Sequence, residues 1–158
     1  MKKYLIALVM ILSSNLYAQD ENNLNHFRFA AIGLYEDAQS SYSGIATWNP
    51  RFYRNGRSIL GASLGGSIFE DQLHKKFLMV ETLLTYRYLL NNHWKLEAGV
   101  GFQSMSDEIG THGVVSGSVH YELKKNKLNI DEVFTGYSNF SYGKEVIHQV
   151  RIGIGFHF

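Results

Sequence analysis

The chain ends on the stretch QVRIGIGFHF, residues Gln149–Phe158, in which apolar side chains alternate with polar or small ones. Successive side chains of a β-strand point to opposite faces, so every second residue lies on the same face. The stretch therefore predicts a strand with one wholly apolar face and one polar face that is rich in glycine. The apolar face comprises Val150, Ile152, Ile154, Phe156 and Phe158.

The same alternation recurs in seven stretches upstream, which are separated by short polar segments. Many short strands of even spacing are typical of an up-and-down barrel. The sequence therefore predicts an all-β fold, an eight-stranded antiparallel up-and-down β-barrel. The regular stretches are Leu60–Ile68, Leu78–Tyr88, Trp94–Gln103 and Val115–Leu123, and the weaker ones are His26–Tyr35, Tyr42–Phe52 and Leu128–Phe140.

The first 18 residues have the three parts of a secretory signal peptide. A basic start precedes the apolar stretch Tyr4–Leu12, which is too short to span a bilayer, and the small residue Ala18 closes the segment. We therefore predict a signal peptide at residues 1–18 and one β-barrel domain at residues 19–158.

The composition of the chain excludes several classes of protein. The net charge of +1 includes Lys2 and Lys3, so it becomes −1 without them and leaves no basic excess for binding nucleic acid. The chain has no cysteine, which excludes disulfides, a thiol nucleophile and a cysteine-ligated metal. No histidines have the spacing of a zinc motif and no glycine-rich phosphate loop precedes a helix, so we expect no metal and no cofactor.

The residue types on the two strand faces indicate which face meets lipid. A water-soluble barrel places its apolar residues inside, and a membrane barrel inverts this arrangement. Small residues fit the crowded interior of a narrow barrel, whereas a solvent face would carry larger polar residues. The apolar face is therefore expected to meet lipid, which makes the predicted barrel transmembrane. The small residues on the opposite face are Gly61, Ser63, Gly65, Ser67, Gly99, Gly101, Ser116, Ser118, Gly153 and Gly155.

Aromatic residues gather near the predicted strand ends, as the two interfaces of a bilayer select. The connections alternate between tight polar turns and longer acidic segments, and we expect the tight turns to face the periplasm. The tight turns are Tyr53–Gly56, Asn91–His93 and Lys124–Lys127, and the longer segments are Glu36–Ser41, Glu70–Lys75, Ser106–His112 and Ser141–Glu145. Aromatics by the longer segments are Tyr35, Tyr42, Phe69, Phe77, Phe102, Phe140 and Tyr142, and those by the turns are Trp48, Phe52, Tyr53, Tyr86, Tyr88, Trp94, Tyr121, Phe156 and Phe158.

The ending Val150–Phe158 resembles the C-terminal strand of bacterial outer-membrane β-barrels, which the barrel-assembly machinery recognises. In size and layout the whole chain is similar to small eight-stranded barrels, the OmpX-like proteins and the OmpA transmembrane domain. The resemblance implies a Gram-negative outer membrane, with lipid and lipopolysaccharide as neighbours. It also implies that Phe156 and Phe158 form the assembly signal. We expect a monomer.

Several charged residues fall on the predicted lumen face: Glu81, Arg87, Lys95, Glu97, His120, Glu122 and Arg151. Burying an isolated charge is costly, so these groups must pair or meet trapped water. We interpret them as a structural ion-pair network that plugs the lumen, and the alternative is an ion or proton path. Eight strands leave an interior about wide enough for side chains, so we predict no large pore.

The segment Gly136–Asn139 resembles the His-x-Ser-Asn stretch of lipid A deacylases, which are small outer-membrane barrels. In that family a histidine activates the serine and a glutamate orients the histidine. Only Ser138 matches here, and His148 with Glu145 forms a conceivable substitute for the other two groups. The facing of Leu128–Phe140 stays open: Ser138 shares the outer wall with His148 if Ile130, Phe134 and Phe140 face lipid, and lies inside if Val133, Thr135 and Tyr137 do.

Three functions follow from the sequence, in order of preference. The connections are short and leave little room for an adhesive surface, so a structural or envelope-integrity role comes first. An esterase that resembles the lipid A deacylases and uses Ser138 comes second. A soluble periplasmic barrel that binds a small ligand comes third, because a fold alone does not determine function.

Overall fold

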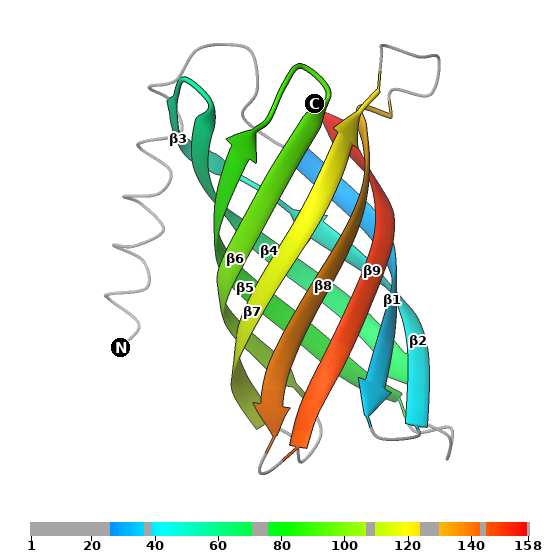
Figure 1. Cartoon of the computed structure of the whole chain (residues 1–158). Helices are drawn as coiled ribbons and strands as arrows, with labels where there is room; N and C mark the ends of the chain where they lie inside the picture. The colour runs from blue at the N-terminus through cyan, green and yellow to red at the C-terminus, as the bar shows by residue number, and fades with distance from the viewer. Residues whose placement is uncertain are drawn as a thin grey trace.

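The computed structural model describes residues 26–36, 39–70, 76–106, 110–123, 130–142 and 145–157, so the predicted signal peptide and Phe158 lie outside the described residues. The described part of the chain folds into strands (Figure 1) and contains no helix long and apolar enough to cross a membrane. The strands are β1 (His26–Glu36), β2 (Gln39–Trp48), β3 (Arg51–Asn55), β4 (Ser58–Glu70), β5 (Lys76–Leu89), β6 (Trp94–Met105), β7 (Gly110–Glu122), β8 (Glu132–Tyr142) and β9 (Glu145–His157).

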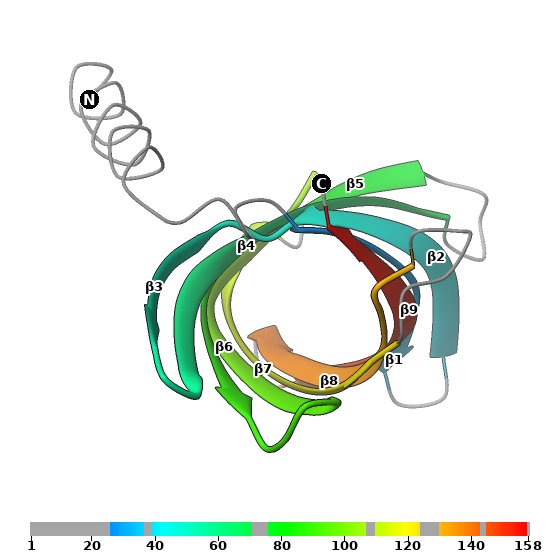
Figure 2. The ribbon, with the colours of Figure 1, turned by 90° about the horizontal axis from the view of Figure 1, so that it is seen from above.

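The strands form one closed antiparallel sheet in the order β2-β1-β9-β8-β7-β6-β5-β4-β3, with a further pairing of β2 with β4. β2 and β3 both pair with β4. They are two segments of one barrel strand, which is interrupted at Asn49 and Pro50. Proline has no backbone N–H to donate to a ladder, which accounts for the break. With β2 and β3 counted as one strand, the barrel has eight strands, as predicted. Figure 2 shows the closed ring.

The lengths of the connections differ from the prediction. Only two residues separate β1 from β2 and β8 from β9, where longer segments were expected. Nine residues separate Glu122 at the end of β7 from Glu132 at the start of β8, where a tight turn at Lys124–Lys127 was expected. Glu132 pairs with Gly155 near the end of β9. The predicted contrast between tight and long connections is therefore wrong.

The outer wall of the barrel is apolar, as the small residues on the opposite strand face predicted. On β9, the side chains of Val150 and Ile152 are 40% and 65% exposed. Gln149, which points to the opposite face of the same strand, is fully buried. This arrangement is the opposite of that in a water-soluble barrel. Other exposed apolar side chains on the wall include Phe29, Leu60, Leu64, Leu78, Leu84, Leu96, Val100 and Val115.

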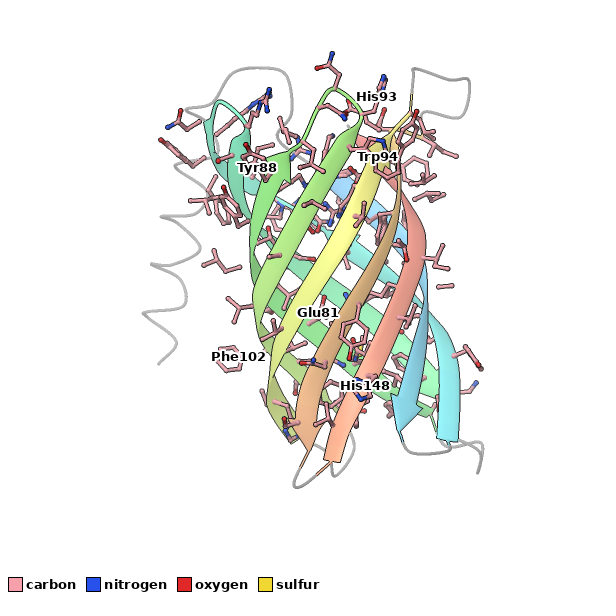
Figure 3. All side chains as sticks on the ribbon, in the orientation of Figure 1. Glu81, Tyr88, His93, Trp94, Phe102 and His148 are labelled. Atoms are coloured by element: carbon pink, nitrogen blue, oxygen red, sulfur yellow. The ribbon has the colours of Figure 1, made fainter. Side chains whose placement is uncertain are left out.

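Aromatic residues are distributed unevenly between the two ends. Tyr88 and Trp94 are exposed at the end that carries the end of β9, and Phe102 projects outward near the opposite end (Figure 3). Phe69 and Phe140, which were expected in the belt at that opposite end, are buried inside the barrel instead. They are lumen residues because their strands place them on the same face as inward-pointing neighbours, so the belt at this end is smaller than predicted.

Candidate functional site

The interior of the barrel has two parts. The half nearest the chain end of β9, here called the charged half, holds Arg28, Arg87, Glu97, His120 and Glu132. The opposite half, here called the apolar half, holds a cluster of buried hydrophobic side chains. The cluster consists of Ala30, Ile32, Leu34, Ile45, Phe69, Met79, Leu83, Met105, Val114, Phe140 and Ile147.

Two arginines share two carboxylates in the charged half. Arg28 grips Glu97 with both terminal nitrogens, Nη1 to Oε1 at 2.7 Å and Nη2 to Oε2 at 2.9 Å. Its Nε donates to Glu132 Oε1 at 2.9 Å. Arg87 donates to Glu97 Oε2 from Nε at 2.9 Å and from Nη2 at 2.7 Å, and its Nη1 lies 3.4 Å from Glu132 Oε2. Each guanidinium therefore bridges both carboxylates, and Arg28 binds Glu97 in the bidentate geometry that arginine favours.

Glu132 is also contacted by histidine. His120 Nδ1 lies 3.0 Å from Glu132 Oε1, and its Nε2 lies 2.7 Å from Ser118 Oγ. His26 Nε2 lies 3.5 Å from the same oxygen of Glu132. The His120 ring stacks on the Phe134 ring with centroids 5.1 Å apart. The Arg28 guanidinium lies 5.5 Å from the centroid of the Phe134 ring. Glu132 is thus the centre of the cluster, with partners on three other strands.

A glycine makes room for this centre. Gly155 of β9 pairs with Arg28 on one side and Glu132 on the other. A Cβ at this position would lie 2.4 Å from His26 Nε2 and 2.7 Å from Glu132 Cγ. Glycine is therefore required where these side chains cross the β9 backbone.

A second group lies between the two halves. The Glu81 carboxylate is fully buried and accepts two hydrogen bonds from Arg151, with Nη1 to Oε1 at 2.8 Å and a second from Nη2 to Oε2. Arg151 Nη2 also donates to Gln149 Oε1 at 2.8 Å. Gln149 Nε2 in turn donates to Gln103 Oε1 at 3.0 Å, which extends the polar chain toward the apolar half. A third pair, Lys95 Nζ to Glu122 Oε2 at 2.6 Å, has a half-exposed carboxylate.

The pairing of charges in the lumen fits a structural cluster. Arg28 and Arg87 bind the two carboxylates of the charged half, Arg51 lines the same space beside Arg87 and Glu97, and Arg151 binds Glu81. Taking each ion out of water is costly, and only close pairs with further hydrogen bonds offset that cost. Each of the five arginine–carboxylate pairings includes a hydrogen bond of 3.4 Å or less. The remaining space between Arg28, Glu97, Ser118 and Arg151 is a cavity of about 40 Å³, room for about one or two waters.

The seven charged residues predicted for the lumen all lie on the inner face or at its rim. Five of them belong to the two groups described above, and the other two form the Lys95–Glu122 pair. Sequence reasoning missed Arg28 and Glu132. Arg28 lies between the outward residues Phe27 and Phe29, so alternation in β1 was the signal for it. Glu132 is the first residue of β8, the strand whose facing stayed open. Alternation therefore did not indicate that Glu132 points into the lumen.

The three residues considered for esterase chemistry are not assembled into a site. Val133 and Tyr137 face outward, so Ser138 points into the lumen, where it is fully buried and donates to Gln149 Oε1 at 2.8 Å. His148 lies on the outer wall, and its Nδ1 contacts the Tyr137 hydroxyl. The sheet separates Ser138 from His148, so His148 has no access to the serine proton. The side chain of Glu145 lies outside the described residues. Among the described side chains, no group of three His, Asp or Glu residues is placed to hold a metal ion.

No protein-family model and no curated protein sequence matches the chain. Solved structures match its fold. Ail, the attachment invasion locus protein of Yersinia pestis, is 13% identical with a TM-score of 0.57, and the match covers 86% of this chain and 97% of Ail. The de novo designed transmembrane barrel TMB2.3 is 12% identical with a TM-score of 0.53, covering 89% and 98%.

Neisserial surface protein A is 14% identical with a TM-score of 0.50, and the match covers 85% of this chain and 96% of that protein. These likenesses establish the fold, which is that of the small eight-stranded membrane barrels. The sequence identities are too low to establish more than the fold. The predicted resemblance to small outer-membrane barrels is confirmed at this level.

Proposed function

We propose that this chain is a bacterial outer-membrane barrel with a structural, envelope-supporting role, and that its lumen is closed. The observation that carries the proposal is the combination of an apolar outer wall with an interior filled by paired charges and apolar side chains. A wall of this kind has a favourable environment only in hydrocarbon, and a closed ladder leaves few backbone groups without partners there. The fold shared with Ail and Neisserial surface protein A supports the outer membrane as the location.

The packing of the lumen supports a role without transport. In the charged half, Arg28 and Arg87 cross the interior to reach Glu97 and Glu132. In the apolar half, side chains such as Phe69 and Met79 are fully buried. The cavity that they leave beside Arg28, Glu97 and Arg151 measures about 40 Å³. Ions would have to break several buried pairs to pass.

The position of Phe156 supports recognition during assembly. Its ring lies on the outer face of β9 and meets the edge of the Phe29 ring with centroids 5.9 Å apart. This contact joins the last strand to the first, so it forms when the barrel closes. We expect Phe156→Ala to slow insertion into membranes that contain the barrel-assembly machinery, and to have less effect on spontaneous folding in detergent.

Three measurements test the proposal. Unboiled protein from the outer-membrane fraction should run compactly on a denaturing gel and shift on boiling, and the same folded sample should give no steady conductance in a planar bilayer. A large, steady conductance from folded protein would contradict a closed lumen. Cells that lack the protein should leak periplasmic enzymes more than cells that produce it, and equal leakage would remove the structural role.

A further inference from the structure

The barrel wall has an incomplete seam between β2 and β4. The ladder between these strands contains four residue pairs, from Ile45 with Ser67 to Trp48 with Leu64. By contrast, β2 pairs with β1 over ten residue pairs, up to Glu36 with Gln39. From Gly44 toward the start of β2, the β2–β4 ladder is therefore not continued.

Two serines replace the missing backbone pairs at this seam. Ser67 Oγ donates to the Gly44 carbonyl at 2.7 Å, and Ser43 Oγ donates across the seam to the Ile68 carbonyl. The two hydroxyl oxygens lie 2.7 Å apart. Inside a membrane each backbone group needs a partner within the protein, so these side chains make an interrupted ladder tolerable at this depth.

A groove with a volume of about 850 Å³ lies on the outer wall over the seam. Small outward residues form its floor: Ala31, Gly44, Ala46 and Gly66. Large apolar side chains form its two rims, Phe29, Ile152 and Ile154 on one side and Ile68 and Leu78 on the other.

We propose that this groove, here called the seam groove, binds one acyl chain of a membrane lipid. The proposal rests on the proposed membrane location. Within a bilayer, association depends on van der Waals packing, because lipid tails are as apolar as the protein surface. A chain in the groove contacts the floor and both rims, whereas a chain on the rest of the wall contacts one side only. An unfilled groove would forfeit those contacts.

The shape of the groove favours an acyl chain over a second copy of the barrel. The wall of another barrel is convex and rigid, so it would rest on rim residues such as Ile68 and Ile152 and leave the floor uncovered. A methylene chain is narrow and flexible enough to reach Gly44 and Gly66. No charged side chain lines the groove, so a lipid headgroup has no ionic partner there and the tail is the part that fits.

Glycine positions on the wall provide a matched pair of variants. A Cβ at Gly66 would meet only the Met79 carbonyl oxygen, at 3.9 Å, so Gly66→Leu fills the groove floor without a clash at its first atom. A Cβ at Gly113 on β7 would meet only the Gly101 carbonyl oxygen, at 4.0 Å. Gly113 is outward-facing but does not line the groove, so Gly113→Leu is the control.

The test uses the full chain in lipid nanodiscs that contain a phospholipid with a photoreactive diazirine in its acyl chain. After illumination, mass spectrometry of the digested protein maps the labelled residues. We expect labelling concentrated on the peptides of β2 and β4 around the groove. Gly66→Leu should reduce that labelling several-fold, and Gly113→Leu should leave it unchanged. The heat shift on a gel verifies that each variant is folded.

Other outcomes overturn the proposal in distinguishable ways. Even labelling around the whole wall, unaffected by Gly66→Leu, would remove the site but leave the membrane barrel intact. Covalent dimers that a bifunctional cross-linker joins at β2 and β4 would assign the groove to a second copy. No labelling anywhere, together with no heat shift, would contradict the membrane location itself.

Discussion

The two halves of the lumen solve the same packing problem by different interactions. The charged half fills the interior with long side chains that must match in number and geometry, as Arg28 and Arg87 match Glu97 and Glu132. The apolar half fills it with side chains such as Ile32 and Met79 that need only fit in volume. From this difference we expect a narrow barrel to tolerate loss of volume in the apolar half better than loss of one charge in the charged half, because an unmatched ion keeps its full desolvation cost.

The largest expected effect comes from removing the centre of the charged half. Glu132→Ala leaves two buried arginines with one shared carboxylate, so we expect the free energy of unfolding to fall by about 3–5 kcal/mol. Urea titration of the folded barrel in lipid vesicles, followed by the heat shift on gels, measures it. A loss below about 1 kcal/mol would mean that the cluster is paired only loosely.

Filling the space at Gly155 should also disrupt the charged half. In Gly155→Ala the new methyl group meets His26 and Glu132, and overpacking of this kind costs about 1–3 kcal/mol. Gly117→Ala is the control, because a Cβ there meets no atom within 4 Å. We expect the control to change the free energy of unfolding by less than about 0.5 kcal/mol. Equal effects of the two variants would contradict the role assigned to Gly155.

In the apolar half, a small loss of volume should cost less. Ile32 is almost fully buried, and Ile32→Val removes one methyl group from the cluster. We expect the free energy of unfolding to fall by about 0.5–1.5 kcal/mol, measured by the same urea titration. If this change matched or exceeded that of Glu132→Ala, the contrast between the two halves would be wrong.

The smallest expected effect concerns Ser138. In Ser138→Ala the neighbours keep other partners, because Arg151 still binds Glu81 and Gln149 still binds Gln103. We expect a loss below about 1 kcal/mol in the free energy of unfolding. Mass spectrometry of lipid A from cells with the wild-type protein or the variant should show the same acyl pattern. A difference that depends on Ser138 would restore the esterase hypothesis.

The sequence predicted the outer wall well because the two faces of most strands differ in kind. On β9, alternation alone separated Ile152 from Arg151. Alternation of residue types is least informative where both strand faces are apolar. In the second half of β1, inward Ile32 and Leu34 alternate with small outward residues. There the period of two carries no contrast, so the apolar half of the lumen was not foreseen.

The charged half was predicted only in part for a related reason. Arg87 and Glu97 lie on regular strands, and their facing followed from neighbours in the same strand. The facing of Glu132 follows from the register of the β8–β9 hairpin, in which Glu132 pairs with Gly155, and alternation within β8 alone left that facing open. The seam between β2 and β4 likewise follows from the break at Pro50 and from register, which a single sequence does not reveal.

The most direct test of the inverted arrangement uses isoleucine side chains as reporters in one sample. With isoleucine methyl groups labelled for NMR and the protein in lipid nanodiscs, nuclear Overhauser effects to acyl-chain protons identify side chains that touch lipid. The account predicts such contacts for Ile152 and Ile68, which are exposed on the wall, and none for Ile32 and Ile147, which are buried in the lumen. Lipid contacts at Ile32 and Ile147, with none at Ile152 and Ile68, would contradict it.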